Sequence, residues 1–379
     1  MKKRILIDVN SVVPYYSLGI QSGIGRTTME LLNAIAQAPE LPFEIMLYSQ
    51  NLRGIGGKNL SLPFKNRHIY LRHTPYWDNF VKKYSIREWT TNYDLMHIPH
   101  NYEIVRYPER CIITLHDAIF MKQADSGFGF QHLRQIIPPF ARQCCHIVTC
   151  SESSKADIIE TMNVPENKVS VVYWGIQHDV FYPQSEKSAI REELKKKYGI
   201  FNSYFLSVSC DGERKRADVL VRSFIQFQKR HNTSFDLVLV WRDPPVSIIH
   251  EVAKEHLENR IHFLQGLSDS DLASLYNGAT ALFFPSSYEG FGLPILEAMA
   301  CGVPVVTCRN SSLYEIGGVV PYYLEEPLED SLIQMMLLFQ TSPSDLLIRI
   351  ESGIKRASSF TWEKAAKQMI QIYRELLQV

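Results

Sequence analysis

Residues 283–306 read FFPSSYEGFGLPILEAMACGVPVV and decide the expected fold. The apolar run 280–284 has the length of a buried strand, and a polar turn follows it. Pro294 then stands where the first position of a helix would fall, with its φ angle already suited to a helix. Gly302 and Pro304 end that helix, and a second strand begins. The order strand, glycine-containing loop, helix and strand predicts an α/β protein.

The loop before this helix has the features of a phosphate-binding site. A helix N-terminus behind a glycine-containing loop offers unpaired N–H groups and a partial positive charge, which suit phosphate. Glu289 lies in the loop and Glu297 in the second turn of the helix. Carboxylates accept hydrogen bonds from hydroxyls, so the pattern favours a phosphate flanked by diols, as in a nucleotide-sugar. The alternative is an ordinary tight turn, and spacing alone does not separate the two.

The same stretch resembles the E-x7-E segment of the retaining glycosyltransferases of family 4. This resemblance implies that Glu289 contacts the transferred sugar and that Glu297 holds the ribose hydroxyls. It also implies that the loop amides bind the distal phosphate. These donor-binding loop residues are Gly290, Phe291, Gly292 and Leu293.

The bulk composition predicts a two-domain protein without a membrane span. The chain has 379 residues, which is long for a single core. Its formal net charge is zero, so the protein has no overall positive charge that would attract nucleic acid. It contains no apolar run of about eighteen residues, the minimum for a membrane-spanning helix. Seven cysteines without a CxxC pair indicate reduced thiols, and we therefore expect a cytoplasmic protein.

A second glycine-containing loop is predicted near the N-terminus. The apolar residues 4–9 read as a buried strand, and the segment 22–27, SGIGRT, reads as a loop that opens onto a helix. A short glycine turn is more often plain geometry than a phosphate cradle. This one resembles the GxGR loop of the same family. The resemblance implies that Gly23 and Gly25 allow close backbone approach to the donor, while Arg26 reaches phosphate or braces the loop.

Residues 51–92 are rich in basic and aromatic side chains and poor in acidic ones. Such a stretch suits anionic lipid headgroups or an anionic acceptor. A solvated face over ordinary core aromatics is the more common arrangement for this composition. Peripheral contact with the inner face of the membrane through residues 51–92 is therefore a hypothesis.

A His–Asp pair follows the apolar run 111–115. His116 and Asp117 stand where open α/β sheets place ligand groups, at the carboxyl end of a strand. A lone histidine is more often structural, but this pair resembles the "HD" segment of the same family. The resemblance implies that His116 lies beside the transferred sugar and that Asp117 is its neighbour. Residues 97–101, HIPHN, also resemble the family and are expected to face the ligand-binding cleft.

The second half of the chain opens with the apolar run 204–208, and DGERKR follows at 211–216. Basic side chains at the carboxyl edge of a sheet can neutralise a diphosphate, although an exposed basic turn is common. The position resembles the family segment whose arginine and lysine bind the diphosphate, which implies Arg214 and Lys215. The family usually has a glycine where this chain has Trp241. Because of this departure, no residues are assigned to the pocket for the nucleotide base.

Two further helices carry expectations of their own. Residues 131–144 are expected to form a helix that Pro138 and Pro139 interrupt. The Asp-x-Asp pattern after Ser268 is interpreted as a helix start and not as a metal site. No metal ligand is assigned in this sequence.

Strands that alternate with helices predict an α/β fold with parallel sheets. The resemblance covers nearly the whole chain and implies the GT-B architecture, two Rossmann-like domains that face a central cleft. Residues 1–178 are expected to form the acceptor domain and residues 179–358 the nucleotide-sugar donor domain. Residues 359–379 are expected to form a helix that crosses back onto the first domain.

The implied reaction is transfer of a hexose from a nucleoside diphosphate sugar to an acceptor hydroxyl, with retention and without metal. The sequence motifs most resemble those of bacterial mannosyl- and rhamnosyl-type transferases of surface polysaccharides. This resemblance favours GDP-mannose as donor. A glycan or lipid-linked glycan is the expected acceptor, and no separate cofactor is expected. The alternatives are a GT-B epimerase, a phosphorylase with pyridoxal phosphate, and a non-catalytic nucleotide-sugar-binding protein.

Overall fold

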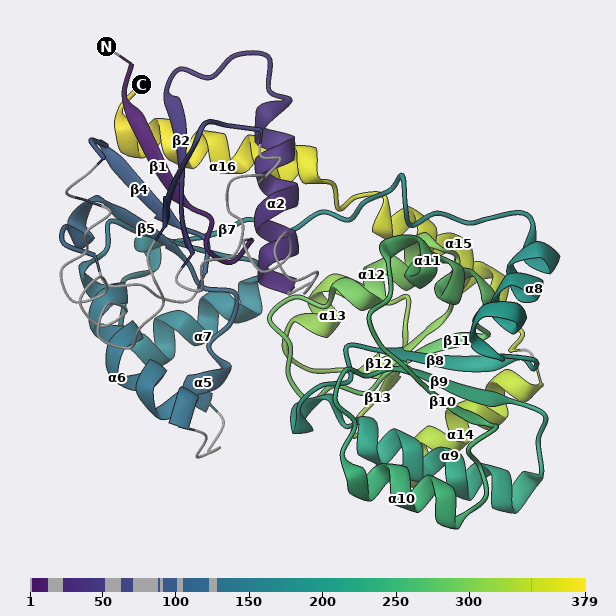
Figure 1. The fold of residues 1–379 in the computed structure, drawn as a ribbon. Coiled ribbons are helices and arrows are strands. Elements are labelled where there is room, and N and C mark those ends of the chain that lie inside the picture. The colour runs from purple at the N-terminus through teal and green to yellow at the C-terminus, as the bar shows by residue number, and fades with distance from the viewer. Residues whose placement is uncertain are drawn as a thin grey trace. The chain divides into compact units, whose positions relative to one another are not determined.

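The computed structural model describes residues 2–12, 23–51, 63–70, 88, 91–100, 105–122, 128–341 and 343–379. The chain divides into two compact units (Figure 1). The first unit comprises Met1–Gly175 and Trp362–Val379, and the second comprises Ile176–Thr361. The returning C-terminal helix therefore begins at Trp362, and residues 359–361 group with the second unit.

The first unit is built on a parallel sheet of seven strands in the order β3-β2-β1-β4-β5-β6-β7. The strands are β1 (Arg4–Asp8), β2 (Glu44–Asn51), β3 (Asn66–Tyr70), β4 (Leu95–Ile98), β5 (Cys111–Thr114), β6 (His146–Thr149) and β7 (Val169–Val171). The helices are α2 (Gly23–Ala36), α5 (Ile119–Lys122), α6 (Phe128–Gln143), α7 (Glu152–Met162) and α16 (Trp362–Leu377). Because helices cover both faces of such a sheet, its inner strands read as continuous apolar runs.

Alternate residues of β4 face the two layers of helices. Met96 and Ile98 belong to the core formed with α6 and α7. His97 faces the opposite side, where its Nδ1 lies 2.6 Å from the Tyr373 hydroxyl of α16 and its Nε2 lies 2.8 Å from the Thr114 hydroxyl. The expectation that His97 faces a ligand is therefore wrong, because the returning helix covers it.

Two local expectations in the first unit are also wrong. Residues 23–27 of the predicted loop are helical, since α2 begins at Gly23. Glycine disfavours a helix only through its backbone entropy, by about 0.5–1 kcal/mol relative to alanine, so these glycines do not exclude one. The predicted break in the helix at Pro138 and Pro139 is absent, and α6 runs through both residues. Burial of Ile137, Phe140 and their neighbours against the sheet offsets the backbone cost of the prolines.

The second unit is built on a parallel sheet of six strands in the order β10-β9-β8-β11-β12-β13. The strands are β8 (Tyr204–Val208), β9 (Asp236–Val240), β10 (Ile261–Leu264), β11 (Ala281–Phe284), β12 (Val305–Cys308) and β13 (Tyr322–Leu324). The helices are α8 (Lys187–Tyr198), α9 (Ala217–His231), α10 (Val246–Lys254), α11 (Asp269–Gly278), α12 (Leu293–Ala300), α13 (Ser311–Gly317), α14 (Glu329–Gln340) and α15 (Leu346–Ala357). The α/β class with parallel sheets is confirmed in both units.

The strand order reverses beside β8 in the second unit. From β8 the chain steps outward through β9 to β10, and it then returns to place β11 on the other side of β8. Open α/β sheets bind ligands at such a reversal, outside the carboxyl ends of the two strands. The loops after β8 and β11 are the segments 209–216 and 285–292. Strand order alone therefore brings the predicted basic turn and the predicted glutamate loop together.

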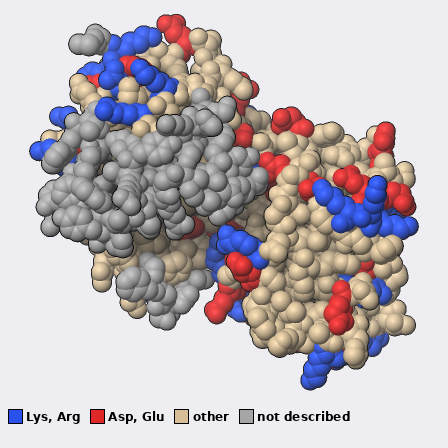
Figure 2. Space-filling model, in the orientation of Figure 1, with Lys and Arg blue, Asp and Glu red and all other residues tan. Residues whose placement is uncertain are grey.

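The charged surface does not form a field of one sign. Figure 2 shows lysine and arginine side chains gathered over α8, and acidic side chains lie among them. The exposed residues of α8 include Lys195 and Lys196 but also Glu192 and Glu193. Among the residues that the structure describes, no helix is both long and apolar enough to cross a membrane. Most of the stretch 51–92 that carries the membrane hypothesis lies outside the described residues.

Candidate functional site

The loops after β8 and β11 are joined by hydrogen bonds to backbone carbonyls. The Ser287 N–H donates to the Arg214 carbonyl at 2.8 Å, and the Ser287 hydroxyl donates to the same oxygen at 3.1 Å. The Arg214 guanidinium donates in turn to the Tyr288 carbonyl at 2.8 Å. The two loops thus form one structural element at the sheet edge, as the strand reversal predicts.

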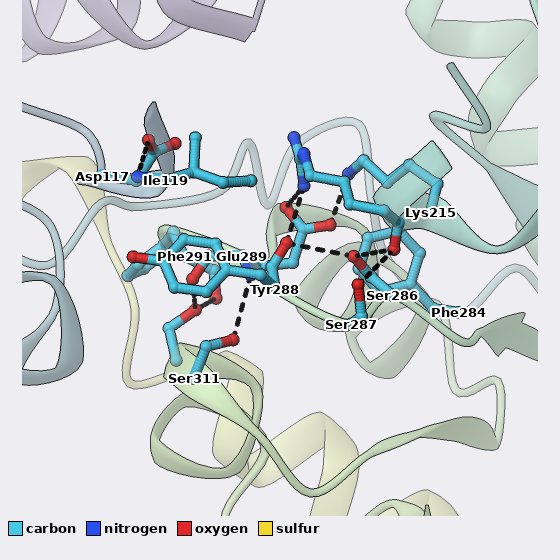
Figure 3. A network of polar contacts seen from close by, with 12 residues as sticks. Asp117, Ile119, Lys215, Phe284, Ser286, Ser287, Tyr288, Glu289, Phe291 and Ser311 are labelled. Atoms are coloured by element: carbon cyan, nitrogen blue, oxygen red, sulfur yellow. Dashed lines mark hydrogen bonds and ion pairs between the residues drawn. The ribbon is translucent and has the colours of Figure 1, made fainter. Parts of the chain in front are cut away.

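A carboxylate between two cations forms the centre of this element (Figure 3). Lys215 Nζ lies 2.5 Å from Glu289 Oε1, and Arg214 Nη1 lies 2.9 Å from Glu289 Oε2. The Lys215 and Glu289 side chains are only 10% and 9% exposed, whereas that of Arg214 is 28% exposed. The Lys215 ammonium also lies 4.8 Å from the centre of the Phe284 ring. We refer to Arg214, Lys215 and Glu289 as the charge triad.

Burial and charge act against each other in the triad. Burial lowers the pKa of the Lys215 amine, and the attraction of Glu289 opposes that change. Burial raises the pKa of the Glu289 carboxyl, but the charges of Lys215 and Arg214 outweigh burial and hold the pKa below its usual range. Glu289 is therefore ionised at neutral pH.

Two serines of α13 hold the backbone of the Glu289 loop. The Ser312 hydroxyl donates to the carbonyls of Glu289 and Phe291, both at 2.9 Å, and the Glu289 N–H donates to the Ser311 hydroxyl at 3.0 Å. Ser311 itself has a φ of 42°, in the left-handed region. In the sequence, residues 310–312 resemble a family segment near this sheet edge, but no individual role was assigned to the serines. Their position after β12, at the same sheet edge, was the signal that could have identified them.

The helix N-terminus next to the triad depends on a glycine. Gly292 precedes α12 with a φ of 107°, a conformation that other residues rarely adopt. A Cβ at Gly292 would also come within 3.0 Å of Leu313 Cδ2. Pro294 occupies the first turn of α12, as the sequence predicts. Gly290 and Phe291 are buried, while Leu293 at the start of the helix is partly exposed.

His116 lies in the first unit at the carboxyl end of β5. Its Nε2 is 3.2 Å from the Pro99 carbonyl, and its ring lies 5.8 Å from that of Trp174. Because a carbonyl only accepts, Nε2 carries the proton and Nδ1 keeps its lone pair. Burial lowers the pKa of His116 to about 4, so the ring is neutral at pH 7. The neighbouring Asp117 carboxylate accepts from the Ile119 N–H at 3.1 Å.

The strand reversal of the first sheet, beside β1, brings His100 of the predicted 97–101 segment close to Asp8, to which the sequence analysis gave no role. Asp8 ends β1 and accepts from the Asn10 N–H at 2.9 Å. His100 Nε2 lies 3.3 Å from the same carboxylate oxygen. The sequence signal for this polar group was the Asp8 carboxylate at the end of the first predicted strand. Of the predicted donor contacts here, Gly23, Gly25 and Arg26 lie in the first turn of α2, and the preceding residues 13–22 lie outside the described residues.

Two family models match most of the chain. The model described as Glycosyltransferase Family 4 matches residues 21–180, and the one described as Glycosyl transferases group 1 matches residues 190–317. This protein belongs to the family 4 glycosyltransferases of the GT-B fold.

Relatives and solved structures agree with this assignment. The glycosyltransferase is 26% identical to the O-antigen chain mannosyltransferase B of Escherichia coli over 374 residues, which cover 94% of this chain and 96% of the relative. Its fold resembles sucrose-phosphate synthase from Thermosynechococcus elongatus, with a TM-score of 0.79, 19% identity and full coverage of both chains. It also resembles Anabaena HepE in complex with UDP-glucose, with a TM-score of 0.76, 17% identity and coverage of 98% and 99%.

Glu297 of this glycosyltransferase lies in a different environment from Glu289. It is 3% exposed on α12, and its Oε2 accepts a hydrogen bond from the Tyr276 hydroxyl of α11 at 2.9 Å. Trp241, which replaces the glycine usual in the family, is buried and packs on Phe263 with ring centres 6.2 Å apart. The Asp-x-Asp pattern is a helix start, as predicted, because Ser268 and Asp271 form the capping box of α11.

We predict that Ser312→Ala destabilises the protein by about 1–3 kcal/mol, because two buried carbonyls lose their shared donor. Urea denaturation followed by circular dichroism measures this change. The matched control is Ser358→Ala, which removes an exposed hydroxyl that donates to the nearby Lys355 carbonyl. Equal unfolding midpoints for the two variants would contradict the role of Ser312.

We also predict a loss of stability between pH 7 and pH 5. Burial lowers the pKa of His97 to about 3 and that of His116 to about 4, both below the ordinary value of 6.5. The unfolded chain therefore takes up protons first as the pH falls, and each histidine costs about 2 kcal/mol over this interval. The measurement is the free energy of unfolding at the two pH values.

The control variants separate this effect from general acid sensitivity. His116→Asn is expected to lose less stability between pH 7 and pH 5 than the wild type, by the contribution of one histidine. His132→Asn removes an exposed histidine of α6 and is expected to keep the wild-type dependence. An identical pH dependence in all three proteins would refute the prediction.

Proposed function

We propose that this glycosyltransferase moves a mannose-type hexose from a nucleoside diphosphate sugar to a hydroxyl of a growing surface glycan, with retention of anomeric configuration. The charge triad carries the proposal, because two cations at a sheet reversal suit a diphosphate and a carboxylate between them suits sugar hydroxyls. The relative that spans nearly the whole chain is named as an O-antigen chain mannosyltransferase, which supports a mannosyl donor, GDP-mannose, and a glycan or lipid-linked glycan acceptor. The HepE structure in complex with UDP-glucose supports a nucleotide-sugar donor.

The proposed mechanism depends on stabilising a leaving diphosphate. Arg214 and Lys215 donate to the diphosphate oxygens as negative charge develops there, and the N-terminus of α12 adds its partial positive charge. These groups supply the charge in place of a metal ion. Glu289 accepts hydrogen bonds from the transferred sugar, and Glu297 is assigned to the ribose hydroxyls. His116, which is neutral at pH 7, accepts from a sugar hydroxyl through Nδ1.

Retention follows from attack on the face that the diphosphate leaves. The bond between the anomeric carbon and the phosphate oxygen breaks, and the acceptor oxygen bonds to the same face of the carbon. The departing phosphate takes the proton of the acceptor hydroxyl, so no protein nucleophile is required. Glu289 is engaged with two cations in this structure, which does not suit a nucleophile.

We predict that one series among GDP-, UDP-, dTDP- and ADP-sugars stabilises the wild type against heat but does not stabilise Lys215→Ala. A ligand at 100 times its Kd adds about 2.7 kcal/mol, which a thermal-shift assay detects easily. The matched control is Lys229→Ala in the last turn of α9, which pairs with Glu255 and not with the triad, and this variant should respond as the wild type does. Equal stabilisation of Lys215→Ala, or no stabilisation by any sugar, would contradict the proposed donor site.

We further predict that a chelator changes the transfer rate by less than about twofold relative to the rate without chelator. The reason is that the triad supplies the positive charge that stabilises the leaving diphosphate. The assay follows release of the nucleoside diphosphate with a glycan acceptor, and NMR of the product reports its anomeric configuration. A rate that collapses with chelator and returns with Mg²⁺ or Mn²⁺ would refute metal independence.

The same assay distinguishes the alternative functions. An epimerised sugar without acceptor would indicate an epimerase, and donor binding without turnover would indicate a non-catalytic binding protein.

A further inference from the structure

Both cations assigned to the diphosphate are already paired with a carboxylate of the protein. Lys215 Nζ is 2.5 Å from one oxygen of Glu289, and Arg214 Nη1 is 2.9 Å from the other. Among the residues that the structure describes, Glu289 is the only carboxylate that forms an ion pair with either cation. A diphosphate and the Glu289 carboxylate are therefore competing anions for the same N–H groups.

The burial of the triad makes this competition strong. The Lys215 and Glu289 side chains are 10% and 9% exposed, and the Phe284 ring lies against the Lys215 ammonium. Charges in such a site interact several times more strongly than charges in water. A phosphate oxygen bound to Lys215 would place a second negative charge within a few Å of the Glu289 carboxylate, and little solvent would screen their repulsion.

The Glu289 loop cannot relieve the repulsion by moving as a whole. Ser311 holds the Glu289 N–H and Ser312 holds its carbonyl, so the backbone is fixed on both sides of the Cα. The side chain alone has to exchange partners when a diphosphate binds. A carboxylate that leaves a buried lysine needs other hydrogen-bond donors, and the hydroxyls of a transferred sugar would supply them.

We infer that Glu289 makes the site discriminate the intact nucleoside diphosphate sugar from its nucleoside diphosphate product. This inference rests on the proposed function. With the sugar present, Glu289 exchanges two cations for sugar hydroxyls, and the diphosphate takes Arg214 and Lys215. With the product, no sugar hydroxyl compensates Glu289, and the carboxylate competes with the diphosphate for both cations. The same contact therefore favours donor binding and product release.

Isothermal titration calorimetry of the full chain tests the inference with pyrophosphate, the nucleoside diphosphates and their sugars, all without acceptor. Glu289→Gln keeps the shape of the side chain and removes its charge. We expect the variant to bind pyrophosphate and the preferred nucleoside diphosphate about tenfold more tightly than the wild type does, which is about 1.4 kcal/mol. The affinity for the nucleotide-sugar should rise less, so that the preference for sugar over product falls at least threefold.

Glu213→Gln is the matched control. Glu213 is exposed, lies next to Arg214 in the chain, and is not its partner in the triad. The control removes the same formal charge from the same turn, so it reports the general electrostatic effect of the substitution. It should tighten pyrophosphate binding by less than about twofold, because exposed charges are screened.

The outcomes separate this inference from the proposed function. If the wild type binds a sugar and its nucleoside diphosphate, but Glu289→Gln binds pyrophosphate no more tightly, the inference alone is overturned. Equal tightening in Glu213→Gln overturns it as well. If the wild type binds neither ligand, the proposed function fails and the inference falls with it. If Glu289→Gln is too unstable to titrate, the measurement is the rise in Tm that pyrophosphate causes. This rise must be larger in Glu289→Gln than in the wild type, because the ligand restores a counter-ion to Lys215. A smaller rise refutes the inference.

Discussion

The ion pair between Lys215 and Glu289 is the interaction on which the second unit's site depends. It joins two loops that are 74 residues apart in the chain. A buried ion pair compensates for its lost hydration only when its geometry is good and its other polar atoms are bonded. Here the Arg214 guanidinium bonds the second oxygen of the Glu289 carboxylate, and the Phe284 ring lies against the Lys215 ammonium. The site is therefore held together by the same charges that make it suitable for an anionic ligand.

The strand order explains why these loops meet. In both sheets the order reverses beside the first strand, β1 or β8, and polar side chains gather at the carboxyl ends on each side of that reversal. The first sheet brings Asp8 and His100 together there, and the second brings Lys215 and Glu289 together. Parallel strands need long connections, so residues distant in sequence become neighbours at one edge.

The electrostatic state of the triad links structure to catalysis. A transferase must hold a diphosphate firmly while the sugar is attached and release it afterwards. Two cations without a carboxylate would bind donor and product alike, and uniform binding of that kind does not favour turnover. We infer that a carboxylate between them, on a backbone held by α13, makes the affinity depend on whether sugar hydroxyls are present. On this inference, the selectivity of the site derives from the same charges that join its two loops.

The sequence by itself determined the features that depend on neighbouring residues. Periodicity, caps and glycine positions over short spans predict the α/β alternation, the Ser268 capping box and the strand–loop–helix unit around Glu289. The family motifs pointed to Arg214 and Lys215. Only the tertiary structure decided that Tyr373 covers His97, 276 residues away, and that α13 clamps the Glu289 loop. It also decided that α6 continues through two prolines. These outcomes depend on which elements pack together, and strand order, which local propensity does not encode, sets that packing.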